Sequence, residues 1–185
     1  PEEGRNPRGA ALSVMSAMDL KPRRVLVTYE SVTGNTKRVA EAIAAVIPGS
    51  VLLPITEAPD PGEYDAVFVG FWCDKGHASE SADAYLKSHP GYPFILFGTL
   101  GGVPGVGYSV TYENRVREEL AAANVPFRAF RLWQGKIDPA LVEKSKARFP
   151  MTPERLSRIA AAATHPDAAD LKDAQVWALE QLTGS

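Results

Sequence analysis

Five runs of apolar residues alternate along this chain with segments of helical spacing. The runs span residues 24–29, 51–55, 65–71, 93–97 and 125–133. The third and fourth runs are almost continuously apolar, as strands covered on both faces of a parallel sheet are. Pro54 places the second run at one edge of the sheet, and the alternation that ends the fifth run suits the other edge.

Helical spacing predicts helices between these runs and beyond the last one. The expected helices cover residues 36–46, 79–88, 112–123 and 168–182, with two further starts at Asp138-Pro139 and Thr152-Pro153. Each of these two pairs has an N-cap residue followed by proline at the first helical position. The alternation predicts an α/β fold, a doubly wound five-stranded parallel sheet of order 2-1-3-4-5 with helices on both faces. Ligands of such sheets bind beyond the carboxyl ends of the strands, where the order reverses.

The bulk composition bounds the domain count and the classes of partner. Of the 185 residues, 45% are hydrophobic. We interpret residues 1–20 as a loose arm or an expression remnant, and residues 21–185 as a single domain with a helical C-terminal extension. No apolar run is long enough to span a bilayer, and no signal peptide is evident. The net charge of −2 does not favour nucleic acid or an anionic membrane surface.

The cysteine and histidine residues indicate neither a disulfide nor a metal site. The single cysteine, Cys73, excludes an internal disulfide and suits a reducing cytoplasm. His89 and His165 each precede a proline and are interpreted as structural. No set of His, Asp and Glu has metal-ligand spacing, so no metal is expected.

A hydroxyl-rich turn joins the first strand to the first helix. It consists of Ser31, Val32, Thr33, Gly34, Asn35 and Thr36. A helix N-terminus presents unpaired N–H groups and the positive end of the dipole, which attract an anion. The turn has neither the lysine of a nucleoside triphosphate loop nor a GxGxxG pattern, so a monophosphate suits it best. The alternative is a helix whose Ser and Thr residues merely cap it.

The loops after the third and fourth strands end at the same edge of the sheet. The first contains Trp72, Cys73, Asp74, Lys75 and Gly76, and the second contains Thr99, Leu100, Gly101, Gly102 and Tyr108. Trp72 either stacks on a flat ligand or covers the core. Lys75 either lies beside that ligand, where its positive charge would stabilise the anion that reduction of the ligand forms, or is a solvated loop residue. For Cys73 we prefer apolar packing to a nucleophilic pair with His77, because no orienting Asn or Asp is identifiable. The glycines of the second loop indicate close approach to a ligand, and Tyr108 either faces that ligand or closes a lid.

The first turn resembles the phosphate loop of flavodoxins, Ser/Thr-x-Thr-Gly-x-Thr, which Ser31, Thr33, Gly34 and Thr36 match. The resemblance covers about residues 24–134 and implies an FMN cofactor. It implies that Trp72 lies against the isoalloxazine ring, and that Tyr108, with Tyr112 as second choice, covers its outer face. Many flavodoxins have glycine where this chain has Cys73. The C-terminal part resembles a subgroup with extra helices, some members of which act beside larger reductases, including bilirubin reduction systems.

On this resemblance we expect an FMN-binding electron carrier that donates electrons to a partner reductase in the cytoplasm. It would be a monomer or weak dimer that binds neither nucleic acid nor membrane. No catalytic residue is assigned, because the flavin carries the chemistry. Two alternatives stay open. One is an FMN-dependent NAD(P)H:quinone-type oxidoreductase, and the other is a binding module of this fold without flavin.

Overall fold

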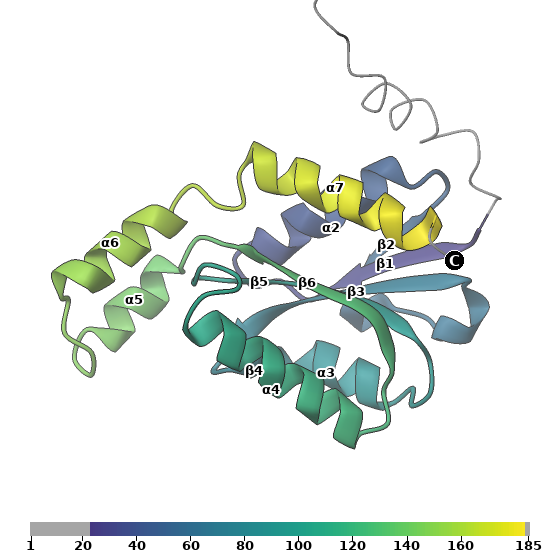
Figure 1. Ribbon diagram of the computed structural model, residues 1–185, viewed down its shortest axis with the longest axis horizontal. Coiled ribbons are helices and arrows are strands. Elements are labelled where there is room, and N and C mark those ends of the chain that lie inside the picture. Colours follow the sequence, from purple (N-terminus) through teal and green to yellow (C-terminus); the bar gives the residue numbers. More distant parts are fainter. Residues whose placement is uncertain (1–22, 184–185) are drawn as a thin grey trace, which may run out of the picture.

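A parallel sheet forms the centre of the computed structural model, which describes residues 23–183 (Figure 1). Its strands are β1 (Val25–Tyr29), β2 (Val51–Pro54), β3 (Ala66–Asp74), β5 (Phe94–Leu100) and β6 (Phe127–Gln134). They run in the order β2-β1-β3-β5-β6, which confirms the predicted fold class and the 2-1-3-4-5 arrangement. The strand that ends in Pro54 and the alternating last strand occupy the two edges, as predicted. The interpretation of residues 1–20 as an arm concerns residues outside those described.

Helices cover both faces of this sheet. Figure 1 shows α2 (Asn35–Val46) and α7 (Ala168–Thr183) on one face, and α3 (Glu80–Lys87) and α4 (Tyr108–Ala122) on the other. Two buried clusters correspond to the two faces, one around Phe68 and Phe97 and the other around Phe71 and Leu96. The last helix is therefore part of the core: Ala174, Trp177 and Leu182 are all buried against the α2 face.

The third strand is longer than the sequence predicts. Residues 72–74 are expected in a loop, but they continue β3, and Cys73 and Asp74 pair antiparallel with β4 (His77–Ala78). Lys75 and Gly76 form the two-residue turn of this hairpin, with φ of 50° and 87°. Two positive φ values are what a tight type I′ hairpin turn requires. Strand alternation therefore determines which way the side chains from Trp72 to Asp74 point.

Helix α4 begins four residues earlier than the sequence predicts. The sequence places its start at Tyr112, whereas α4 begins at Tyr108, directly after Gly107. The first turn is Tyr-Ser-Val-Thr, which has low helix propensity and follows a glycine-rich loop, so it reads as loop. Short 3-10 turns η1 (Ile55–Glu57) and η2 (Pro61–Glu63) connect β2 to β3.

Two short helices between β6 and α7 project away from the sheet (Figure 1). They are α5 (Pro139–Ser145) and α6 (Pro153–Ala162), and both begin with the predicted caps. The Asp138 carboxylate accepts the Ala140 N–H at 2.9 Å, and the Thr152 hydroxyl accepts the Arg155 N–H at 3.2 Å. No residue of α5 is buried, and of α6 only Ala162 is buried. Within residues 23–183, none of the helices has the length and hydrophobicity needed to cross a membrane.

Candidate functional site

The hydroxyl-rich turn leaves the N-terminus of α2 free of side-chain caps. The residue at the N-cap is Gly34, with φ 96°, and no side chain accepts a hydrogen bond from the first turn of the helix. The Ser31 hydroxyl instead accepts the N–H of Gly34 itself at 3.1 Å. A Cβ at Gly34 would meet nothing within 4 Å, so the turn is open on its outer side. The interpretation of Ser31–Thr36 as an over-capped helix is therefore wrong, and the first N–H groups of α2 are available to an anion.

Two side chains of this turn are engaged within the protein. The Thr36 hydroxyl lies 2.8 Å from the Thr99 hydroxyl, and both residues are buried. The Asn35 amide donates to the carbonyl of Lys136 at 2.8 Å. These contacts tie the turn to the ends of β5 and β6. They leave Thr33, whose side chain is exposed, as the hydroxyl at the open side of the turn.

Trp72 lies on the same face of the sheet as α2. It pairs in register with Thr99 of β5, which in turn pairs with Trp133 of β6. Since Thr99 contacts Thr36 on α2 and Trp133 packs in the α2-side cluster, the alternation of β3 puts the Trp72 indole on this face too. The indole Nε1 is buried and has no hydrogen-bond partner among the described residues. The structure thus brings Trp72, Thr99 and Thr36 together at the carboxyl end of the sheet.

The glycines of the loop after β5 are explained by contacts within the protein. A Cβ on Gly101 would lie 2.5 Å from the Ile137 side chain, and one on Gly102 would lie 2.7 Å from the Ser109 hydroxyl. The expectation that these glycines mark close approach to a ligand is not needed to explain them. The Ser109 hydroxyl is nevertheless buried without a partner in the described structure, so it can still bind a polar group. Leu100 is itself the last residue of β5 and is buried.

The hairpin tip gathers Cys73, Tyr108 and Arg115 on the opposite, α4 side of the sheet. The Tyr108 hydroxyl would lie 2.6 Å from a Cβ on Gly76, and Arg115 donates to the Gly76 carbonyl at 3.3 Å. Burial raises the pKa of the Cys73 thiol, opposed by hydrogen bonds from Gly76 and Tyr108 and by the charge of Arg115. The thiol is therefore protonated at neutral pH, which suits packing rather than nucleophilic attack. Tyr108 is 57% exposed and lies over the hairpin turn.

Two sequence alternatives for this region are wrong. His77 bonds Glu119 of α4 at 2.7 Å, so it is not paired with Cys73. Tyr112 is fully buried in the core, so it cannot cover a ligand's outer face.

Lys75 and Asp74 form no ion pair with each other among the described residues, and Lys75 is exposed at the hairpin turn. Arg115, inside a helix and remote in sequence, is the cation that the structure brings to the hairpin and that sequence patterns did not signal.

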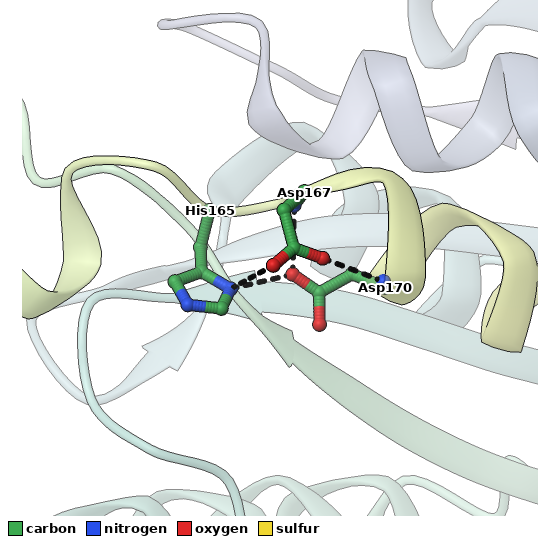
Figure 2. A group of neighbouring side chains, drawn as sticks. All are labelled: His165, Asp167 and Asp170. Atoms are coloured by element: carbon green, nitrogen blue, oxygen red, sulfur yellow. Dashed lines mark hydrogen bonds and ion pairs between the residues drawn. The ribbon is translucent and has the colours of Figure 1, made fainter.

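A second polar cluster lies where α6 leads into α7 (Figure 2). His165 Nδ1 is 2.6 Å from an Asp170 carboxylate oxygen, and ligand-type atoms of His165, Asp167 and Asp170 lie within 4.8 Å of one another. The sequence did not predict this grouping, since no set of His, Asp and Glu with metal-ligand spacing was expected. The two carboxylates exchange backbone hydrogen bonds, Asp170 N–H to Asp167 and Asp167 N–H to Asp170, which is a reciprocal cap of α7. The Asp170 N–H lowers the pKa of Asp167. Helix capping and the hydrogen bond between His165 and Asp170 explain this cluster. At a separate place, His89 bonds the Tyr85 carbonyl and is likewise structural.

Hydrogen bonds fix both ends of the segment that contains α5 and α6 beside the hydroxyl-rich turn, Ser31–Thr36. Gly135 N–H bonds the Leu100 carbonyl at 2.8 Å, and Lys136 N–H bonds the His165 carbonyl at 2.8 Å. The Lys136 carbonyl accepts the Asn35 amide described above.

A hollow lined by Arg24, Gly49 and Tyr64 opens at the amino ends of β1 and β2, at the opposite end of the sheet from the hydroxyl-rich turn.

Comparisons with known proteins agree with the fold described above. The family model of the flavodoxin domain matches residues 26–178. A flavodoxin-like domain-containing protein, BilS of Clostridioides difficile strain CD3, is 29% identical over 168 residues, covering 85% of this chain and 95% of that protein. Among solved structures, a WrbA-like flavodoxin from Agrobacterium tumefaciens has a TM-score of 0.51 at 16% identity, covering 88% of this chain and 97% of that one. Oxidised flavodoxin 2 from Bacillus cereus has a TM-score of 0.50 at 16% identity, covering 85% and 98%.

Proposed function

We propose that this chain, which belongs to the flavodoxin family, binds FMN at the carboxyl edge of its sheet and carries electrons to a partner protein. The observation that carries the proposal is the uncapped N-terminus of α2, surrounded by Ser31, Thr33 and Gly34. A helix N-terminus of this kind binds phosphate through backbone N–H groups and the helix dipole. Bound FMN supplies one- and two-electron redox chemistry that side chains lack.

The residues at this edge fit such a cofactor. The backbone N–H groups of Asn35, Thr36 and Lys37 would hold the phosphate, with the Thr33 hydroxyl as a further donor. The buried, unpartnered Trp72 Nε1 and Ser109 hydroxyl are the kind of groups that bind a polar ligand. They supply hydrogen bonds and a stacking surface, and no general acid or base is needed.

We propose further that the carrier works in a reducing compartment such as the cytoplasm, as a monomer or weak dimer, without direct binding to nucleic acid or membrane. Tyr108 and the hairpin from Cys73 to Gly76 border the flavin. Arg115, rather than Lys75, is the positive charge held in place by a hydrogen bond at this hairpin.

Replacement of Trp72 should weaken both FMN and riboflavin by the same factor. An aromatic stacking contact with a flat ligand contributes about 1–3 kcal/mol, so Trp72→Ala should raise both dissociation constants roughly ten- to a hundredfold. The measurement is a titration that follows flavin fluorescence. Trp177→Phe is the matched control, because Trp177 is buried between α7 and the sheet and should leave both affinities unchanged. Unchanged flavin affinities in Trp72→Ala would rule out the stacking role.

Carrier and stand-alone reductase are separated by a simple assay. The FMN-loaded protein alone should oxidise NADH and NADPH no faster than free FMN does, with or without a quinone. Sustained turnover of either nucleotide without a partner protein would contradict the carrier function and favour an NAD(P)H:quinone-type enzyme.

A further inference from the structure

The segment from Asp138 to Ala162, which we term the α5–α6 arm, exposes apolar side chains that nothing in the described structure covers. Leu141 is 58% exposed, Phe149 54% and Leu156 51%. They lie on α5, on the connection and on α6, so they extend over the whole arm. Single exposed apolar residues are common on protein surfaces, but here three large ones lie close together in sequence on one projecting segment, as residues of interaction surfaces do.

The two helices of the arm are tied to each other, and of the arm's residues only Ala162 is buried. Arg155 of α6 donates hydrogen bonds to the Phe149 carbonyl and to the Ser145 hydroxyl of α5, which links the two helices. On α6, Leu156 and the half-buried Ile159 lie three residues apart on one face. Polar side chains link the arm internally, while an apolar side of α6 stays accessible.

The arm also carries a charge opposite to that of the chain as a whole. Residues 138–162 contain five basic and three acidic side chains, net +2, whereas the whole chain has net −2. The rest of the chain therefore carries −4. Lys144 and Arg158 take part in no ion pair of the described structure. An acidic surface with an apolar centre is the complement of this arm.

The arm begins beside the proposed cofactor site. Just before the arm, the Lys136 carbonyl accepts a hydrogen bond from the Asn35 amide of the hydroxyl-rich turn. Just after the arm, His165 bonds back to Lys136 and is held by Asp170. Figure 1 shows the arm leaving the body at the carboxyl end of the strands. A protein held by the arm would therefore face the edge of the sheet where electrons leave the flavin.

We propose that the α5–α6 arm is the docking surface for the redox partner, a protein that offers an acidic rim around an apolar groove. This rests on the proposed function, which requires a partner close to the flavin. A second copy of this chain is the rival occupant, since its body is acidic. An arm that docked on the body of the next copy would make a head-to-tail contact that propagates into open chains unless it closes into a ring. One arm and one partner groove form a closed complex instead.

The test uses site-specific photo-cross-linking of the full chain in its source cells. A benzophenone amino acid replaces Leu156 on the arm or, as a control of similar exposure, Val176 on α7, which is 46% exposed. Mass spectrometry identifies the cross-linked protein and peptide. We expect Leu156 to capture a flavin-, haem- or iron–sulfur-containing protein through a peptide rich in Asp, Glu and apolar residues, in at least tenfold higher yield than Val176.

Reversing two charges on the α5–α6 arm provides a second test. Lys144→Glu with Arg158→Glu should lower the Leu156 cross-link about tenfold, while Lys144→Arg with Arg158→Lys should preserve it. Both pairs are exposed and far from the core, and circular dichroism checks that the helices are kept. A product with a second copy, with lipid, with residues 1–22 or with a non-redox protein overturns the proposal, as does equal yield at Val176 or no product.

Flavin content of the same preparations separates this proposal from the proposed function. If the protein with Lys144 and Arg158 unchanged binds FMN but gives no specific cross-link from position 156, the docking surface alone is overturned. Protein that takes up no FMN overturns the proposed function, and with it the redox identity of the partner.

Discussion

A Thr33→Asp variant should lose most of its affinity for FMN while keeping its affinity for riboflavin. Thr33 is exposed at the open side of the turn, next to the uncapped N-terminus of α2. A carboxylate roughly 5 Å from a phosphate charge costs about 3 kcal/mol at an effective dielectric of about 20, before screening. We therefore expect FMN to bind about a hundredfold more weakly. Riboflavin lacks the phosphate and should not distinguish variant from wild type.

The matched control is Thr33→Asn, which has nearly the same size as the aspartate but no charge. It should bind FMN within about fivefold of the wild type, because the backbone N–H groups are unchanged and only one hydrogen bond is altered. High salt should restore part of the Thr33→Asp loss. An equal loss for FMN and riboflavin, or no loss for either, would mean that the phosphate is not bound at this turn.

A Gly70→Ala variant should fold with markedly lower stability. Gly70 lies in β3 beside Phe97 of β5, and both are buried. A Cβ on Gly70 would lie 2.3 Å from two atoms of the Phe97 ring, which is far inside contact distance. Overpacking of this kind costs about 1–3 kcal/mol, or roughly 3–10 °C in Tm for a domain of this size. Thermal unfolding followed by circular dichroism measures it.

Phe97→Leu tests whether this clash is the cause. Alone it should destabilise the protein by removing a buried ring. Combined with Gly70→Ala it should cost clearly less than the two single changes added together, because the ring that the new methyl group meets is gone. Strict additivity of the two changes would show that Gly70 is required for another reason.

Much of the fold could be predicted because it depends on local patterns. Continuous apolar runs identify β3 and β5 as central, and Pro54 identifies β2 as an edge strand. The N-caps Asp138 and Thr152, each followed by proline, identify α5 and α6. The early start of α4 at Tyr108 and the hairpin at Lys75 were not predicted. Both depend on glycine-adjacent residues whose helical or strand state is decided by packing on the sheet.

The candidate site was predictable as a set of loops but not as a set of contacts. The turn from Ser31 to Thr36 is visible in the sequence because its residues are contiguous. The Thr36–Thr99 and Asn35–Lys136 hydrogen bonds join residues 63 and 101 positions apart, so no local pattern indicates them. The same holds for Arg115, whose place at the hairpin follows from how α4 packs. Gly101 and Gly102 are in addition explained by the room they leave for Ile137 and Ser109, a contact that the sequence does not indicate.

FMN binding is tested most directly by the visible absorption spectrum of the purified protein after incubation with FMN and removal of free ligand. We expect a flavin spectrum with one FMN per chain, released by heat as a molecule with the mass of FMN rather than riboflavin or FAD. The Thr33→Asp variant should retain far less flavin under the same treatment. A protein that is colourless after this treatment, while still folded by circular dichroism, would show that the chain does not bind FMN.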